Sequence, residues 1–126
     1  MSNPIKVLIV DDDPRNIRIL NEMLEDVFML GNAENGSEAL NKIDTFQPQL
    51  VLLDSMMPDL DGLEVCRLIR NNEQHSKLKI IIVSGRAGKT DLTEGINAGA
   101  NAYLTKPFDE NKLMETIHDV LEIAIP

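Results

Sequence analysis

The sequence has few of the residues that cross-link small proteins or anchor them in membranes. Its single cysteine, Cys66, has no partner for an intrachain disulfide. This indicates a reducing compartment, so we expect a cytoplasmic protein. No apolar run approaches the roughly 20 residues of a membrane-spanning helix. Lys6 and Asp11 interrupt the N-terminal segment before a signal-peptide core can form. We therefore expect no contact with a membrane.

Basic residues are also scarce. Lys and Arg number 12 against 21 Asp and Glu, which gives a net charge of −9. A chain of this charge repels nucleic-acid phosphates, so we set DNA and RNA aside as direct partners. The two histidines, His75 and His118, have no partners at the spacing of a metal site. We expect both to be solvated, whereas Cys66 falls in an apolar stripe and is expected in the core.

The 126 residues instead contain an alternation of two hydrophobic patterns, at a length that suits one domain spanning 1–126. Short apolar runs rich in β-branched residues predict strands buried on both faces. These runs cover residues 5–10, 27–30, 50–53, 80–83 and 102–104. Apolar residues at helical spacing separate them, and the last two helices are predicted over 89–98 and 110–125.

The helix ends carry recognisable signals. Asp13 before Pro14 is typical of an N-cap with proline at the first helical position. Asn35 and Asp109 are further N-cap candidates, and Gly99 suits a left-handed helix C-terminus. The order βαβαβαβαβα predicts an α/β fold, with a five-stranded parallel sheet flanked by five helices and right-handed crossovers. Sites in such open sheets form beyond the carboxyl ends of the strands.

Chemically active residues follow the predicted strands. Asp11 and Asp12 follow the first run, Asp54 the third, Ser84 the fourth, and Lys106 comes soon after the fifth. Clustered carboxylates repel one another, and a hard divalent cation such as Mg²⁺ resolves that repulsion. Asp54 is the candidate nucleophile, because a carboxylate can attack phosphorus to form an acyl phosphate. Lys106 would neutralise charge on the transferring group, and Ser84 would bond its oxygens.

Four stretches at these strand ends resemble those of a known family. They are residues 10–13 (VDDD), 54–62 (DSMMPDLDG), 83–85 (VSG) and 103–108 (YLTKPF). With all four in this order, the chain closely resembles response-regulator receiver domains over essentially its whole length. The resemblance implies a flavodoxin-like, doubly wound (βα)5 fold. It also implies a signalling role, in which Asp54 accepts a phosphoryl group from a sensor histidine kinase or a histidine phosphotransfer protein.

The same resemblance implies a set of metal ligands for Mg²⁺. Asp12 would be the direct ligand of the acidic pair, and Asp11 would act mainly through water. Asp54 would be the phosphoacceptor and a second ligand. Met56 would contribute its backbone carbonyl.

A conformational switch is implied as well. Ser84 matches the switch hydroxyl, Tyr103 the switch aromatic, and Lys106 the lysine of the site, whose bond to Pro107 is cis in the family. On phosphorylation Ser84 would move toward the phosphoryl group and Tyr103 would turn inward. The surface of the fourth helix, fifth strand and fifth helix would then change shape for a downstream effector or a second copy of the domain.

Two positions that vary within the family tune its chemistry. Met56 has no side-chain group to orient an attacking water, and Arg86 can reach a phosphoryl oxygen or a neighbouring acid. We therefore predict a phosphoryl group that lasts minutes or longer. Gly62 is expected to relieve backbone strain, and Gly85 to leave the phosphoryl site open.

Other functions remain to be weighed. In a phosphatase of the haloacid-dehalogenase type, Asp11 and Asp13 would be the nucleophile and the acid/base, but Asp54 would then have no role and no acidic motif follows Lys106. A binding module that takes no phosphate is a second alternative, although its acidic residues and lysine are all present. A flavin-binding protein lacks support, because no phosphate loop follows the first strand.

The ends of the chain leave its organisation open. The Met-Ser-Asn start is typical of a natural beginning, and the chain stops at Pro126, where a linker or effector domain would begin. A free-standing domain and the N-terminal part of a longer regulator have the same sequence features.

Overall fold

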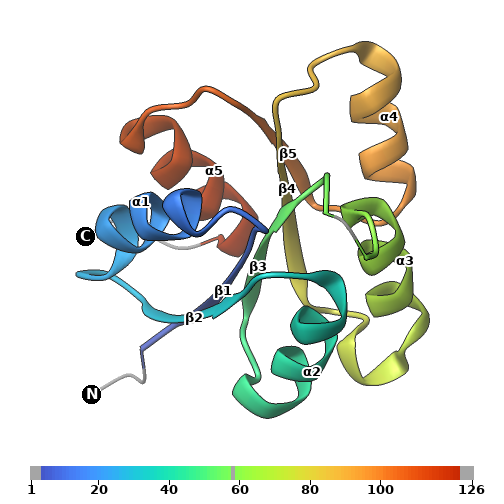
Figure 1. Ribbon diagram of the computed structural model, residues 1–126, viewed down its shortest axis with the longest axis horizontal. Coiled ribbons are helices and arrows are strands. Elements are labelled where there is room, and N and C mark those ends of the chain that lie inside the picture. Colours follow the sequence, from blue (N-terminus) through green and yellow to red (C-terminus); the bar gives the residue numbers. More distant parts are fainter. Residues whose placement is uncertain (1–3, 58, 123–126) are drawn as a thin grey trace.

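The computed structural model describes residues 4–57 and 59–122. Its five strands form one parallel sheet in the order β2-β1-β3-β4-β5 (Figure 1). The strands are Lys6–Val10 (β1), Met29–Ala33 (β2), Leu50–Asp54 (β3), Lys79–Ser84 (β4) and Ala102–Thr105 (β5). The helices are Pro14–Leu24 (α1), Gly36–Phe46 (α2), Gly62–Asn71 (α3), Lys89–Asn97 (α4) and Glu110–Leu121 (α5), with a short 3₁₀ turn at Glu73–His75 (η1). The predicted flavodoxin-like α/β fold is confirmed.

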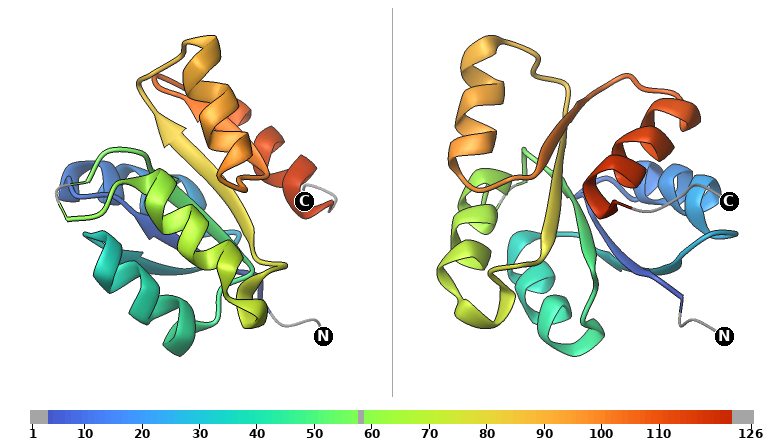
Figure 2. Two further views of the ribbon diagram at one scale, coloured as in Figure 1. Left: turned by 90° about the vertical axis from the view of Figure 1, so that its right-hand side faces the viewer. Right: turned by 180° about the vertical axis from the view of Figure 1, so that it is seen from behind.

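The sheet separates two layers of helices. Helices α1 and α5 cover one face, and α2, α3 and α4 cover the other (Figures 1 and 2). Side chains alternate along each strand, so neighbouring residues enter different cores. On β4, for example, Ile82 packs toward α3 and Val83 toward α1 and α5. This alternation decides on which side of the sheet each residue at the carboxyl ends lies.

The predicted helix caps are confirmed. Asp13, Asn35 and Asp109 each accept a hydrogen bond from a first-turn backbone N–H. Gly99 has φ +112°, the left-handed conformation expected after α4. These bonds satisfy amides that the helix itself leaves unpaired. They set the point at which the chain leaves the carboxyl edge of the sheet.

The predicted position of β2 is wrong. The sequence pattern favoured residues 27–30, whereas the strand runs from Met29 to Ala33. The N–H groups of Val27 and Phe28 bond to Leu24 O and so belong to the turn that closes α1. Strand β2 is at the sheet edge and is partly exposed, so it lacks the continuous apolar run of a central strand.

Smaller differences concern α5 and the histidines. Helix α5 ends at Leu121, with Glu122 in a left-handed conformation at φ 57°, and the predicted residues 123–125 lie outside the described part of the chain. The prediction that His75 is solvated is wrong, since its Nε2 lies 2.8 Å from Asp44 Oδ1 and its side chain is only 20% exposed. His118 on α5 is half-buried, with its side chain 39% exposed, so its predicted exposure to solvent is confirmed only in part.

The single cysteine lies where the sequence predicts it. Cys66 is fully buried, and burial raises the pKa of its thiol. The core prediction for Cys66 is therefore confirmed.

Within residues 4–57 and 59–122, the helices are too short or too polar to cross a bilayer.

Candidate functional site

Three charged residues from different strands converge at the carboxyl edge of the sheet. Asp11 follows β1, Asp54 ends β3, and Lys106 follows β5. Lys106 Nζ lies 3.6 Å from Asp11 Oδ2 and 3.9 Å from Asp54 Oδ1. The residues come from strands that pair through β1–β3 and β3–β4–β5, so the parallel register brings them together. The peptide bond between Lys106 and Pro107 is cis, as the resemblance implied.

Asp12 completes an acidic cluster with Asp11 and Asp54. One oxygen from each of the three carboxylates lies within 4.8 Å of the others. Asp11 and Asp54 are buried, at 3% and 8% exposure, whereas Asp12 faces solvent. The cluster thus has two buried carboxylates and one accessible carboxylate. Hard oxygen donors of this number and spacing fit a divalent cation that keeps several waters.

The electrostatics of Asp54 support the same interpretation. Burial, followed by the nearby charge of Asp11, raises the pKa of Asp54 from 3.8 to about 6, and Lys106 only partly offsets this. Three carboxylates therefore share one ammonium group in a partly dry site. A bound cation would remove this excess of negative charge. The residues present fit the divalent metal site that their strand-end positions predicted.

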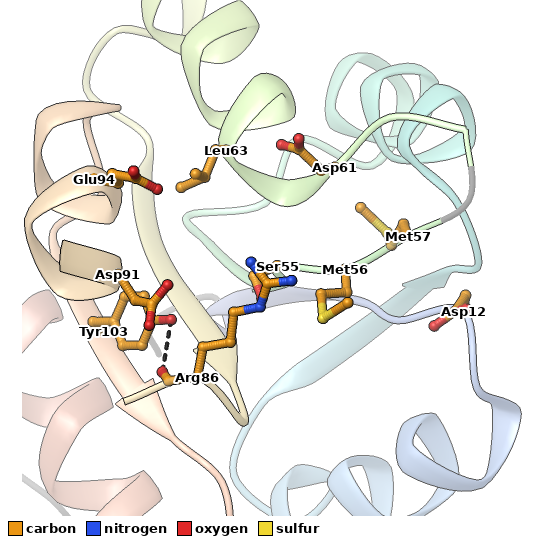
Figure 3. A pocket seen from close by; sticks show the side chains of 10 residues that line it. All are labelled: Asp12, Ser55, Met56, Met57, Asp61, Leu63, Arg86, Asp91, Glu94 and Tyr103. Atoms are coloured by element: carbon orange, nitrogen blue, oxygen red, sulfur yellow. Dashed lines mark hydrogen bonds between the residues drawn. The ribbon is translucent and has the colours of Figure 1, made fainter. Parts of the chain in front are cut away.

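Next to the acidic cluster is an open hollow of about 450 Å³. Met56, which is 55% exposed, lines it with Arg86 and Tyr103. The Arg86 side chain points across the hollow toward Ser55 and Met56 (Figure 3). Among the ion pairs of the described residues, none involves Arg86. Its guanidinium group is therefore available to an anion that enters from this side.

Ser84 is buried at the end of β4 and has two hydrogen-bond partners. Its Oγ accepts from Arg86 N at 3.0 Å and from Ser55 Oγ at 2.7 Å. The Tyr103 hydroxyl donates to Arg86 O at 2.9 Å, the dashed contact in Figure 3. The backbone of Arg86 therefore bonds to both predicted switch residues, through its N–H to Ser84 and through its carbonyl oxygen to Tyr103. Sequence reasoning missed Ser55, although a hydroxyl directly after Asp54 offered a signal.

The loop between β3 and α3 is tied to the start of α2 by Asp59. Its carboxylate accepts from Gly36 N at 2.9 Å, Ser37 N at 3.1 Å and Ser37 Oγ at 3.0 Å. These bonds lower the pKa of Asp59 to about 2. Sequence reasoning missed this residue too, because its partners lie more than 20 positions away. Pro58, part of the same motif, lies outside the described residues.

The two glycines of the motifs differ in their surroundings. A Cβ added at Gly85 would meet no heavy atom within 4 Å beyond those of its chain neighbours, so the packing does not require glycine there, and its role in keeping the phosphoryl site open stays a prediction. Gly62 is needed for a different reason from the one predicted. It has no left-handed φ, but a Cβ there would collide with Asp54 O and lie 2.8 Å from Ser55 Cα. The start of α3 thus packs directly on the backbone of the acidic site.

Comparison with known proteins agrees with this geometry. The family model of the response regulator receiver domain matches residues 7–118. Protein PilH from Pseudomonas aeruginosa is 38% identical over 117 residues, covering 92% of this chain and 97% of PilH. The structure of Vibrio cholerae chemotaxis protein CheY4 is 28% identical with a TM-score of 0.89, covering 94% of this chain and 99% of that one.

Some relatives are longer. The response regulator MprA from Mycolicibacterium vanbaalenii is 36% identical over 124 residues, which cover 98% of this chain but 53% of MprA. The chain therefore spans about half the length of several curated relatives that it matches.

The family match also bears on two of the three alternative functions, the phosphatase and the flavin-binding protein. It covers the segments that contain Asp11, Asp54, Ser84 and Lys106. It identifies a signalling module rather than a phosphatase or a flavin-binding enzyme. With the strand order, the acidic cluster and these relatives in agreement, the chain belongs to the response regulator receiver domain family.

Proposed function

We propose that the chain accepts a phosphoryl group on Asp54 from the phosphohistidine of a sensor histidine kinase or a histidine phosphotransfer protein. The observation that carries this proposal is the placement of a buried Asp54 beside Asp11 and Lys106, whose ammonium nitrogen lies within 4 Å of both carboxylates. A candidate nucleophile, an ammonium group and oxygen donors that fit a divalent metal thus lie together at one end of the sheet.

In this reaction a carboxylate oxygen of Asp54 attacks phosphorus and forms an O–P bond. The P–N bond to the donor imidazole breaks, and the nitrogen keeps the electron pair and takes up a proton. Lys106 neutralises charge on the phosphoryl oxygens, and the Ser84 hydroxyl bonds one of them. Positioning and charge stabilisation are the main requirements of phosphoryl transfer.

Mg²⁺ is the cofactor that these oxygen donors favour. Asp12 and Asp54 would bind it directly, Asp11 through water, and Met56 through its backbone carbonyl. When bound, Mg²⁺ supplies charge neutralisation for the phosphoryl oxygens. The exposed position of Asp12 leaves one side of the site accessible to the donor.

The output depends on Ser84 and Tyr103. In our proposal Ser84 leaves its present partners for the phosphoryl group, Tyr103 turns inward, and the surface of α4, β5 and α5 changes. A cytoplasmic effector, an attached output domain or a second copy of the chain would bind the changed surface. The longer relatives support an attached domain, and PilH supports a free-standing one.

Intact mass spectrometry tests the phosphoacceptor directly. Acetyl phosphate with Mg²⁺ should add one phosphoryl group, and Asp54→Asn or a chelator should abolish the gain. No gain with either acetyl phosphate or a phosphorylated histidine phosphotransfer protein would favour a phosphate-independent module. If the phosphoryl group is still gained in Asp54→Asn but not in Asp11→Asn, then Asp11 and not Asp54 is the nucleophile.

The lifetime of the phosphoryl group is a separate proposal. Met56 offers no side-chain group to orient water, and Arg86 points into the hollow beside it, so hydrolysis should take minutes or longer (Figure 3). Loss of label from the purified phosphoprotein can be followed over time. Hydrolysis within seconds would contradict this assignment.

A further inference from the structure

The residue after the phosphoacceptor makes a contact that the proposed reaction does not use. Ser55 Oγ donates to Ser84 Oγ at 2.7 Å, so the bond joins the residue after β3 to the last residue of β4, 29 positions away. Ser84 is 1% exposed, so this hydroxyl pair is shielded from water on the Ser84 side. A hydrogen bond in such surroundings selects one side-chain orientation more strongly than an exposed one does.

The alternation of the sheet shows which orientation is selected. Ile82, two residues before Ser84, packs in the core beneath α2, α3 and α4, whereas Leu52, two residues before Asp54, packs in the core beneath α1 and α5. Ser84 and Asp54 therefore project from opposite faces of the sheet. The strand backbone places the Ser84 side chain on the face that also carries Tyr103, and the bond to Ser55 favours one orientation of its hydroxyl there.

The bond between Ser55 and Ser84 is also connected to Tyr103. Ser84 Oγ accepts from Arg86 N, and Arg86 O accepts from the Tyr103 hydroxyl. Ser55, Ser84, the Arg86 backbone and Tyr103 thus form one continuous network of hydrogen bonds. Among the hydrogen bonds of the described residues, none joins Ser84 to Asp54. Movement of the Ser84 hydroxyl toward Asp54 would take it away from both of its donors, Ser55 Oγ and Arg86 N.

We propose that Ser55 is a positioning residue that stabilises the resting conformation of Ser84 and so sets the equilibrium between the resting and switched states. The inference rests on the proposed function, since it assumes that Ser84 moves to a phosphoryl group on Asp54. A phosphoryl oxygen on Asp54 would accept from the Ser84 hydroxyl, whereas the Ser55 hydroxyl donates to it. The two partners therefore favour different orientations of the Ser84 side chain. Loss of one neutral hydrogen bond should raise the ratio of switched to resting protein by about threefold to tenfold.

The chain provides its own probe, because Tyr103 is the only tyrosine. Labelling with 3-fluorotyrosine therefore gives one ¹⁹F resonance. Its position without phosphate defines the resting state, and its position with Mg²⁺ and beryllium fluoride, a phosphoryl mimic, defines the switched state. In unphosphorylated Ser55→Ala the resonance should move toward the switched position. Ser55→Thr, which retains a hydroxyl, should restore the resting position.

A matched control is Ser76→Ala. Ser76 also donates a hydroxyl hydrogen bond, to Glu73 O at 3.2 Å, but it lies between η1 and β4, at the opposite end of that strand from Ser84. This variant should leave the Tyr103 resonance unchanged. Thermal melting of each variant checks folding, and Ser55→Gly replaces Ser55→Ala if the latter melts below the working temperature.

The outcomes separate the two proposals. If beryllium fluoride shifts the wild-type resonance but Ser55→Ala leaves it in place or moves it the other way, Ser55 does not stabilise the resting state and only this inference fails. If the wild-type chain neither gains a phosphoryl group nor responds to beryllium fluoride, the proposed function fails and the role of Ser55 fails with it.

Discussion

Replacing Asp54 by asparagine should stabilise the metal-free protein. Asp54 is 8% exposed, and burial together with Asp11 raises its pKa from 3.8 to about 6. The folded state therefore disfavours the charged form that predominates at neutral pH. Asparagine has nearly the same shape and no charge, and its Oδ1 can still accept the long 3.4 Å bond from Met56 N. The substitution removes the electrostatic cost and retains the packing.

The pH range of this effect follows from the direction in which the pKa of Asp54 is shifted. A carboxyl group whose pKa is higher in the folded state than in the unfolded state contributes stability below the unfolded value, and that contribution is lost as the pH rises through the folded value. For Asp54 the free energy of unfolding should fall between pH values of about 4 and about 6. The advantage of Asp54→Asn should be complete above this window and absent below it.

The magnitude is about 3 kcal/mol at most for a pKa that rises from 3.8 to about 6. Solvent at the open side of the site screens the charge, so we expect about 1–2 kcal/mol at pH 7.5. This corresponds to an increase in Tm of roughly 3–10 °C for a domain of this size. Asp26→Asn, at an exposed aspartate, should change Tm far less.

Thermal or denaturant unfolding at pH 7.5 and pH 4, with a chelator present, measures the effect. Adding Mg²⁺ should stabilise the wild type more than the variant, because ligand binding to the folded state adds stability and the variant lacks one ligand. If Asp54→Asn is no more stable than the wild type at pH 7.5 without metal, the buried charge of Asp54 is not destabilising and our account of the site is wrong.

Three further substitutions test other parts of the site. Lys106→Met should slow phosphorylation by acetyl phosphate by roughly 100-fold, the usual cost of one charge-stabilising group, and an unchanged rate would remove Lys106 from the mechanism. Gly62→Ala should destabilise the fold by about 1–3 kcal/mol in denaturant unfolding, because its Cβ would meet the backbone of Asp54 and Ser55, and a neutral result would contradict that packing. Asp59→Ala should lower Tm, and it should weaken Mg²⁺ binding measured by titration calorimetry. Because the pKa of Asp59 is lowered to about 2, the difference in Tm between variant and wild type should be constant from pH 5 to pH 8. A difference that changes with pH would point to another group.

The sequence by itself determined the architecture and which charged side chains meet at the carboxyl edge of the sheet. Central strands of a parallel sheet are apolar on both faces, so β1, β3 and β4 were visible as short apolar runs. The carboxyl ends of parallel strands meet at one edge, so the convergence of Asp11, Asp54 and Lys106 was predictable before any distance was known.

Only the tertiary structure decided the features that depend on burial or on contacts between distant segments. The edge strand β2 has one neighbour and a mixed pattern, so its position was misjudged. Two sets of hydrogen bonds join segments 22 to 29 residues apart, which local patterns do not encode. They are the bond from Ser55 to Ser84 and the bonds that Asp59 accepts from the start of α2. The raised pKa of Asp54 likewise depends on how deeply the sheet and its helices enclose the carboxylate, a property of the packed fold rather than of any residue type.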